Sequence, residues 1–214
     1  MERAGDRAGV AASLRGCAVV YMQAGDARSA RPYILQARAV GHAAGDRHGD
    51  VWSEYKLGWA ATLIGNYPEA RAQFLAARAG FEEQGASFGA YACTVWLADV
   101  SRLEGHWRAA LGSYREALDR IRTHHFTVHG VDFLEGLALS AAALSRLDAS
   151  ARLFAAAATW FDTRGAEIRT SLDRDACDQA INHVCVRLGE AAWEGCMPRD
   201  DGLAPRRRFS WRRR

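Results

Sequence analysis

Small and large apolar residues recur along the chain at helical spacings, and the pattern repeats every forty residues. Short turn-forming pairs mark the repeat at Gly25-Asp26, Gly65-Asn66 and Gly105-His106, and Ser145-Arg146 continues the series. Five residues after the first position of each turn the residue is small, nine residues after it is large and apolar, and twelve residues after it is alanine. In that order, these residues are Ala30, Ala70, Ala110 and Ser150; Ile34, Phe74, Tyr114 and Phe154; and Ala37, Ala77, Ala117 and Ala157. Because one register holds across so many positions, the sequence predicts an array of structural repeats.

Each repeat is predicted to contain two helices, which in the second repeat cover about Val51–Ile64 and Pro68–Gln84. Gly65 supplies the turn between them, where a positive φ is often needed. Pro68 stands in the first turn of the following helix, where its missing N–H costs nothing. Small residues let the paired helices approach closely, and larger ones fill the space between them; they are Gly58, Ala70 and Ala77, and Leu57, Tyr67 and Phe74.

A second series of turns is predicted between successive repeats. Gly5–Gly9 recurs as Gly45–Gly49, and two more glycines follow at Gly85 and Gly89. One helix pair cannot bury its apolar face alone, so the stacking of neighbouring pairs makes the core continuous.

The composition agrees with a helical, soluble protein. Hydrophobic residues make up 49% and charged residues 25%, and there are only 4 prolines. About one residue in five is alanine, the best helix former. The five cysteines contain no CxxC pair, which indicates reduced thiols in a cytoplasm. The N-terminus lacks the apolar stretch of a signal peptide, and charged residues interrupt the most apolar segment, 134–161, so neither secretion nor a membrane span is expected.

The net charge of +3 hides an uneven distribution. Residues 199–214 hold seven arginines and two aspartates, so the remainder of the chain is mildly acidic. A DNA-binding fold usually spreads basic charge over one face of the domain. Nucleic-acid binding is therefore expected only through the tail segment Arg206–Arg214, where Phe209 and Trp211 stand among the arginines.

The pattern LG-x6-GNYPEA-x3-F-x2-A at Leu57–Ala77 resembles the tetratricopeptide repeat. The forty-residue period, the GDRxG-type turns and the pair Trp52-Ser53 resemble one subset of these arrays. That subset occurs in large ATP-binding bacterial transcription regulators, often of the LuxR type, and in related cyclase-linked ATPases. The segment Arg152–Ala157 and the later Gly189–Trp193 resemble the end of such arrays.

The period and the resemblance together predict an all-α fold, a right-handed α-solenoid of about four two-helix repeats with a closing helix. The repeat domain is expected to span residues 1–197, with a basic, disordered tail at 198–214. Its units cover about residues 10–49, 50–89, 90–130 and 131–170, and the closing helix covers 172–195.

The chain also departs from this family. Glu54 stands where an apolar residue is usual, Ser145 replaces a turn glycine, and neither a Walker A motif nor a helix-turn-helix is present. Because Gly5–Gly9 is interpreted as a turn between repeats, Met1–Ala4 is interpreted as the end of a preceding helix. We therefore expect a piece of a longer protein or a remnant gene, with an uncapped end through which homodimers form.

The resemblance implies that the first helix of each unit lines a binding groove. By position, the residues of the predicted groove are Trp52, Tyr55, Trp59, Val95, Asp99, Arg102, Asp132 and Glu135, and the corresponding places in the first unit are held by Ala12, Arg15, Val19 and Met22. Trp52, Tyr55 and Trp59 stand at i, i+3 and i+7 on one helical stripe. Such a stripe either anchors a peptide or small ligand or packs against a neighbouring helix, and the sequence leaves both interpretations open.

Other motifs are expected to carry no chemistry. Gly85–Gly89 matches the GxSxG nucleophile elbow, but that motif needs a strand-to-helix turn, and the forty-residue period already explains both glycines. Histidines 124, 125 and 129 lie close together in sequence, with Asp132 nearby, and are expected to be solvated or capping residues. Cys185 and His183 point about 160° apart on a helix at 100° per residue, so no zinc site is expected with Cys177. No catalytic residue, metal or cofactor is predicted.

The resulting function hypothesis is a non-catalytic binding or scaffold domain in the cytoplasm. It would be the interaction or effector-sensing arm of a bacterial signalling or transcription regulator, with a protein, a peptide or a small-molecule effector as its partner. A free-standing adaptor and a nucleic-acid binder that uses the arginine-rich tail are the alternatives.

Overall fold

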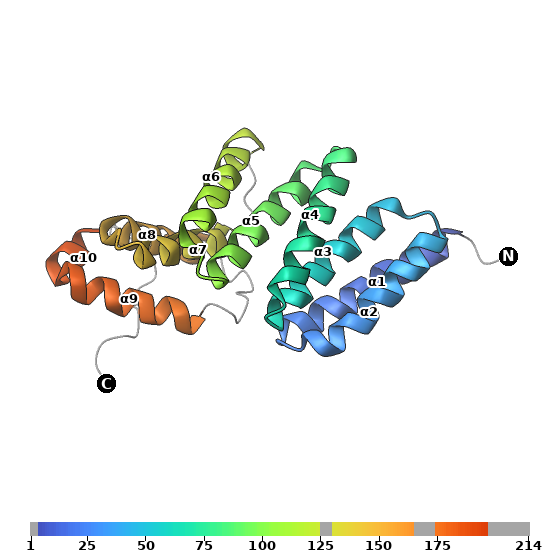
Figure 1. Ribbon diagram of the computed structural model, residues 1–214, viewed down its shortest axis with the longest axis horizontal. Coiled ribbons are helices and arrows are strands. Elements are labelled where there is room, and N and C mark those ends of the chain that lie inside the picture. Colours follow the sequence, from blue (N-terminus) through green and yellow to red (C-terminus); the bar gives the residue numbers. More distant parts are fainter. Residues whose placement is uncertain (1–3, 125–129, 165–173, 197–214) are drawn as a thin grey trace. The chain divides into compact units, whose positions relative to one another are not determined.

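The computed structural model describes residues 4–124, 130–164 and 174–196, and all regular secondary structure in these ranges is α-helical. The all-α prediction is therefore confirmed. The helices follow one another as consecutive packed pairs (Figure 1). They are α1 (Ala4–Gln23), α2 (Ala27–Ala43), α3 (Arg47–Leu63), α4 (Tyr67–Glu83), α5 (Ser87–Leu103), α6 (Trp107–His124), α7 (Gly130–Ala143), α8 (Leu147–Arg164), α9 (Arg174–Leu188) and α10 (Glu190–Cys196).

The described helices belong to two compact units. The first unit holds α1 to α5 and the part of α6 from Gly112 onward, and the second holds Trp107–Leu111 and α7 to α10. In the first unit each helix packs on the next, from α1 through α5. The alternate helices also meet, α1 with α3 and α3 with α5. The first helices of the repeats therefore form one continuous layer in this unit.

The same turn joins nearly every pair of successive helices. Its glycine has a positive φ in each case: 81° at Gly25, 74° at Gly45, 76° at Gly65, 67° at Gly85 and 79° at Gly105. These positions are twenty residues apart, so the forty-residue period of the sequence is one helix pair with the same turn used twice. A side chain at the N-cap often completes the turn. Those of Asp26, Asp46 and Asn66 each accept a hydrogen bond from the backbone N–H three residues on.

The two GDRxG segments are predicted to be turns, and this prediction is wrong for most of their residues. Gly5–Gly9 lies inside α1, and Gly49 lies in the first turn of α3. Gly49 is required there by packing, not by φ. A Cβ atom at this position would lie 2.0 Å from Oδ2 of Asp46 and 2.4 Å from Nη1 of Arg15. The second glycine of the motif thus lets Asp46 cap α3 and lets Arg15 reach it from α1.

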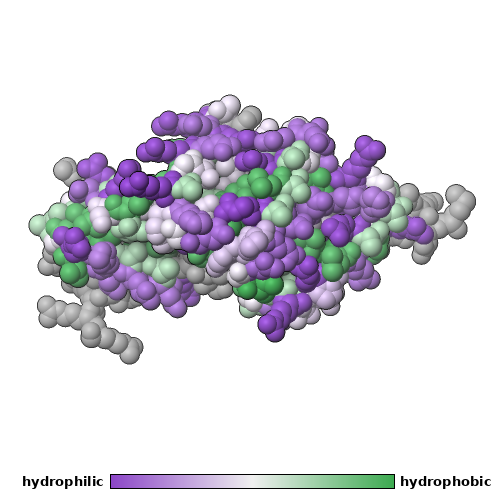
Figure 2. Space-filling model, in the orientation of Figure 1, coloured by the Kyte–Doolittle hydropathy of each residue, from purple (hydrophilic) through white to green (hydrophobic). Residues whose placement is uncertain are grey.

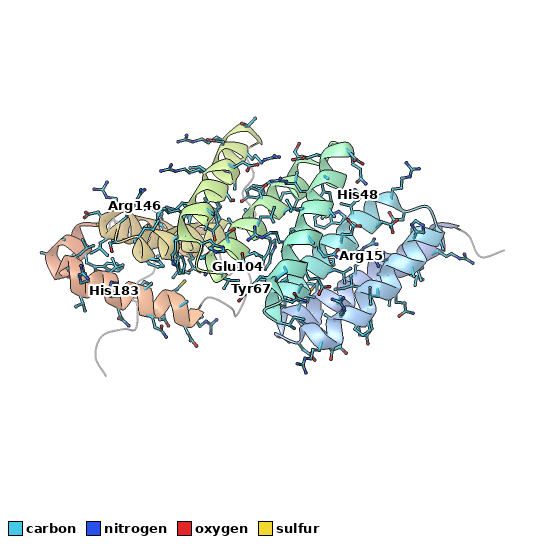
Figure 3. All side chains as sticks on the ribbon, in the orientation of Figure 1. Arg15, His48, Tyr67, Glu104, Arg146 and His183 are labelled. Carbon is cyan, nitrogen blue, oxygen red and sulfur yellow. The ribbon has the colours of Figure 1, made fainter. Side chains whose placement is uncertain are left out.

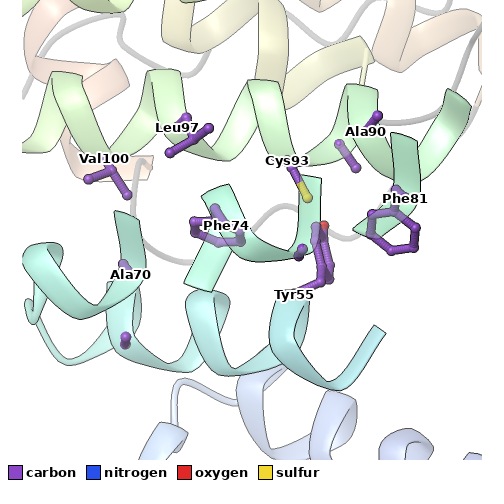
Figure 4. Packing of buried hydrophobic residues seen from close by; sticks show 11 residues of the cluster. Tyr55, Ala70, Phe74, Phe81, Ala90, Cys93, Leu97 and Val100 are labelled. Atoms are coloured by element: carbon purple, nitrogen blue, oxygen red, sulfur yellow. The ribbon is translucent and has the colours of Figure 1, made fainter. Parts of the chain in front are cut away.

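Phe74 lies at the centre of the largest core cluster, which α3, α4 and α5 build together (Figure 4). Its ring packs against the backbone of Gly58, where a Cβ atom would lie 2.9 Å from the ring. Tyr55 of α3 and Cys93 and Leu97 of α5 surround it. The predicted pairing of small residues on one helix with a large residue on the next is confirmed here.

The second unit has its own core, formed by α7, α8, α9 and α10. The hydroxyl of Ser150 donates to the carbonyl oxygen of Ala138 at 2.8 Å and ties α8 to α7. A single closing helix is predicted over 172–195, but two helices are found. The chain turns at Gly189, whose φ is 83°, and this turn lets Trp193 of α10 pack into the core.

Ion pairs connect the second helices of successive repeats. Arg31 pairs with Glu69 at 2.8 Å, and Arg120 pairs with Glu82 at 3.0 Å. The two pairs occupy different positions of the repeat, and the order of their charges is reversed, so each is a separate link between neighbouring second helices. Hydrophilic residues cover this part of α4 and α6 (Figure 2). Among the described residues, no helix is long and apolar enough to cross a membrane.

Candidate functional site

The predicted groove residues of α3 lie in the layer of first helices. Tyr55 is buried, whereas Trp52 and Trp59 are only partly buried. We use the name first-helix face for the partly buried side chains that α1, α3 and α5 contribute to this layer: Arg15, Trp52, Lys56, Trp59 and Trp96. Trp52, Lys56 and Trp59 stand at i, i+4 and i+7, so α3 presents them as one stripe.

At the Trp52 end of the stripe, the aromatic side chains pack into the hydrophobic core. The ring of Trp52 packs edge-on against Phe81 and Tyr55, with centroid distances of 4.8 and 5.3 Å. Its indole N–H donates to Nε2 of His48 at 2.8 Å, and Nδ1 of His48 lies 2.7 Å from Oε1 of Gln84. Both ring nitrogens of His48 are thus engaged when the proton sits on Nδ1. Trp52 and Tyr55 are therefore held in place by neighbours from α3 and α4.

Trp59 lies differently. Its ring meets that of Trp96 of α5 at a centroid distance of 5.8 Å, and Trp96 in turn stacks on Phe74 at 5.6 Å. The indole N–H of Trp96 donates to the hydroxyl of Tyr55 at 2.7 Å. The indole nitrogen of Trp59, by contrast, is buried and has no hydrogen-bond partner within the described ranges. An unmatched buried donor is costly, so this position calls for an acceptor.

The predicted residues of α5 form an internal network. The Asp99 carboxylate accepts hydrogen bonds from the Tyr114 hydroxyl and from Nη2 of Arg102, the latter at 3.2 Å. All three side chains are buried, and so is Val95. Burial, reinforced by the negative charge of Asp99, raises the pKa of Tyr114 well above its ordinary value.

The two remaining predicted residues belong to α7 in the second unit. Glu135 is buried there, and Asp132 lies in the first turn of α7, with its side chain outside the described part of the chain. Of the predicted groove residues, Trp52 and Tyr55 are in direct contact, and Trp59 packs against the same core cluster.

Sequence reasoning missed Lys56, the only lysine among 28 basic residues. Its ammonium nitrogen lies 5.9 Å from the centroid of the Trp52 ring, a cation–π contact. Loss of hydration, together with repulsion by Arg15, lowers the pKa of Lys56 to about 8. The single lysine in an arginine-rich chain was the available signal, but only the packing of α1 on α3 brings Arg15 to it.

Arg15 reaches from α1 toward α3 (Figure 3). Its Nη2 lies 3.3 Å from Oδ2 of Asp46 at the start of α3, and its side chain is 13% exposed. Its other terminal nitrogen, Nη1, is buried and finds no hydrogen-bond partner in the described part of the molecule. The first-helix face thus carries two cations, Arg15 and Lys56, and two buried donors without a hydrogen-bond partner among the described residues, Nη1 of Arg15 and the indole N–H of Trp59.

Replacing Lys56 by methionine is expected to raise the free energy of unfolding by about 1–3 kcal/mol at neutral pH, because a partly desolvated cation is removed. The folded-state pKa of about 8 lies below the ordinary value of 10.5. Between these values the folded state binds fewer protons than the unfolded state, so wild-type stability rises with pH and the advantage of the variant shrinks. Urea unfolding of both proteins across this pH range measures the effect.

Arg115→Met, which removes an exposed cation from α6, is the control and should change the free energy of unfolding little. An unchanged or lower stability of Lys56→Met at neutral pH would contradict the prediction.

The other chemical candidates gain no support from the fold. Ser87 of the GxSxG match opens α5 directly after the turn that follows α4, so it does not stand on a strand-to-helix turn. Within the described ranges, histidines, cysteines and carboxylates form no group suited to a metal ion. His125, His129 and the tail Arg206–Arg214 lie outside the described residues.

Residues 2–83 match the model of the tetratricopeptide repeat family. The match ends at the last residue of α4, so it covers two complete helix pairs. No match is found among curated proteins or among solved structures. The match and the stacked helix pairs define a tetratricopeptide-like array, and repeats of this kind form non-catalytic scaffolds that generally mediate protein–protein interaction.

Proposed function

We propose that the first unit is a binding scaffold whose first-helix face holds a segment of a protein partner. The family match supports a role in protein–protein interaction, and its residues include α1 and α3 of this face. The packing of α1, α3 and α5 into one layer gives the face a fixed shape. A rigid array of aromatic side chains binds at low entropic cost, because its residues are already ordered.

The observation that carries the proposal is the state of Trp59. Its ring is partly exposed and fixed against Trp96, and its buried indole N–H lacks an acceptor among the described residues. Large rings with one polar donor are frequent anchors at protein interfaces.

Replacing Trp59 by phenylalanine should weaken the binding of a cognate peptide about five- to tenfold, since the indole donor is lost while an aromatic ring stays. Peptides for this test come from selection of a displayed random twelve-residue library on the wild-type protein. Their dissociation constants are then measured by calorimetry. Trp193→Phe changes a tryptophan of α10 in the second unit and serves as the matched control. If no selected peptide distinguishes Trp59→Phe from the wild type, the proposal is wrong.

In the cell, the scaffold would act as the interaction arm of a bacterial signalling or transcription regulator in the cytoplasm. The forty-residue repeats with their Gly–Asp turns support this context through their resemblance to such arrays. An immunoblot of the source cells against this segment tests it. A band well above 23.5 kDa agrees with one arm of a larger regulator, and a band at 23.5 kDa favours a free-standing adaptor. A small-molecule effector, homodimerisation and nucleic-acid binding by the tail stay predictions from the sequence.

A further inference from the structure

One side of α1 is exposed and carries no charge. We use the name α1 outer face for five exposed residues that lie within one third of the helix circumference: Gly9, Val10, Ser13, Cys17 and Val20. Val10 is 47% exposed and Val20 is 66% exposed. Between residues 8 and 23 the only charged side chain is Arg15, which pairs with Asp46 of the next repeat. A helix side that faces water normally carries charged residues, so this composition is typical of an interaction surface.

The forty-residue period shows how the same side is used in the later repeats. The equivalent positions are Gly49, Asp50, Ser53, Leu57 and Ala60 in α3, and Gly89, Ala90, Cys93, Leu97 and Val100 in α5. All of them are buried except Asp50, which is half-buried. Leu57 and Ala60 belong to a core cluster with residues of α1 and α2, and those of α5 pack on α3 and α4 (Figure 4). In α3 and α5, this side is therefore the surface that packs on the preceding helix pair.

Gly9 gives independent support for a missing neighbour. At the equivalent Gly89, a Cβ atom would lie 2.5 Å from the ring of Phe81, which belongs to the preceding helix pair. At Gly49, a Cβ atom would collide with Arg15, which also comes from the preceding pair. At Gly9, a Cβ atom would meet nothing within 4 Å in the described part of the chain. Glycine inside a helix costs about 1 kcal/mol relative to alanine, so a close contact with a further helix would explain its presence.

We propose that the α1 outer face is the contact surface of a homodimer, in which α1 packs antiparallel on α1 of a second copy. Among the described helices, α1 packs only on α2 and α3, whereas α3 packs on α1, α2, α4 and α5. A second copy therefore supplies the helix contact that α1 lacks. The α1 outer face shares no residue with the first-helix face, so the inference does not rest on the proposed function.

The order of residues along the α1 outer face makes it complementary to itself. The larger Val10 and Val20 stand at its ends, and the smaller Ser13 and Cys17 stand between them. A twofold axis midway between Ser13 and Cys17 places each valine against the other valine of the second copy, and Ser13 against Cys17. Small side chains at the centre let the two helices approach closely, and no like charges meet. Closed contacts of this twofold kind are the commonest in oligomeric proteins.

Sedimentation equilibrium of the full chain under reducing conditions tests the dimer. A contact of this small size is expected to have a dissociation constant in the micromolar range, so the wild type should change from monomer to dimer between about 1 and 100 µM. Val20→Lys should raise the dissociation constant at least about tenfold, because each copy then brings an ammonium group into an apolar contact. Leu75→Lys, at an exposed apolar position of α4, is the matched control and should dimerise like the wild type. Both residues are exposed, so neither variant should unfold.

A disulfide trap tests the antiparallel arrangement. Ser13→Cys should place a thiol opposite Cys17 of the second copy, and mild oxidation should then give a covalent dimer with links between positions 13 and 17. Non-reducing electrophoresis detects the dimer, and mass spectrometry of its peptides identifies the linked positions. Ala76→Cys, which adds a thiol at an exposed position of α4, is the control and should give no link to Cys17.

Three outcomes would overturn the inference. The first is a wild-type chain that stays monomeric at about 100 µM. The second is a dimer that Val20→Lys does not weaken or in which Ser13→Cys gives no link between positions 13 and 17, because the contact then lies elsewhere. The third is an assembly that grows beyond the dimer with rising concentration, since a twofold contact closes at two copies.

Discussion

Replacing Phe74 by alanine is expected to lower the free energy of unfolding of the first unit by about 3–5 kcal/mol. The ring is fully buried among α3, α4 and α5, where it faces Tyr55 at 5.8 Å and stacks on Trp96 at 5.6 Å between ring centroids. Its removal leaves a cavity that helices held by short turns cannot close. Urea unfolding followed by circular dichroism measures the loss. Leu75→Ala, at an exposed position of the same helix, should cost under about 0.5 kcal/mol. A cost for Phe74→Ala as small as this would show that the core does not depend on the ring.

A substitution at Gly58 tests directly whether this residue contacts the Phe74 ring. Gly58→Ala should lower stability by about 1–3 kcal/mol in the wild type, because its Cβ atom would lie 2.9 Å from the Phe74 ring. In the Phe74→Ala background the clash is absent, and alanine then gains about 1 kcal/mol over glycine as a helix former. The substitution should therefore change from destabilising to neutral or stabilising. An equal cost in both backgrounds would mean that the two residues are not in contact.

The turns between helices are the most predictable part of the fold. A left-handed turn residue is nearly always glycine, so the spacing of Gly25, Gly65 and Gly105 is enough to identify the period. Ser145 keeps the same turn at a φ of 57°, which the register predicts despite the substitution.

At Gly49, by contrast, the presence of a glycine led to a wrong prediction of a turn. A glycine needed for positive φ and a glycine needed for close packing are identical in sequence, although only the first ends a helix. Gly45 is of the first kind, and Gly49, pressed against Asp46 and Arg15, is of the second. The distinction depends on the two side chains that press against Gly49: the N-cap Asp46, three residues before it, and Arg15 of α1, which is more than thirty residues away in sequence.

The candidate site is predictable only in outline. Helical spacing puts Trp52, Tyr55 and Trp59 on one stripe, but it cannot tell an anchor from a core residue. The difference comes from other helices, since Phe81 of α4 covers Trp52, whereas Trp96 of α5 leaves Trp59 partly exposed. Lys56 acquires its lowered pKa in part from Arg15, and the packing of two first helices that creates this pair is not encoded in local spacing.

Replacing Arg102 by methionine is expected to lower the free energy of unfolding by about 3–5 kcal/mol, since the change removes the cation that pairs with the buried Asp99 carboxylate. Methionine fills much of the volume of arginine, so the loss of stability measures the missing charge more than the missing packing. Chemical unfolding at neutral pH measures this loss of stability, and Arg115→Met is again the exposed control.

The double variant Asp99→Asn with Arg102→Met should lose clearly less stability than the sum of the two single variants, because the carboxylate that needs the cation is then gone. Additive costs would show that Asp99 and Arg102 act independently.

Tyr114 adds a pH dependence to this network. Its folded-state pKa lies well above the ordinary 10.0, so above about pH 10 the unfolded state loses a proton that the folded state retains. The unfolded state then binds fewer protons, and stability falls as the pH rises. Tyr114→Phe should cost about 1–2 kcal/mol at neutral pH, where a buried hydrogen bond to Asp99 is lost. Above pH 10 the stability gap between the variant and the wild type should narrow, since the variant has no phenol to ionise. A gap that stays constant up to pH 11 would mean that the Tyr114 hydroxyl is not held in its protonated form by the Asp99 network.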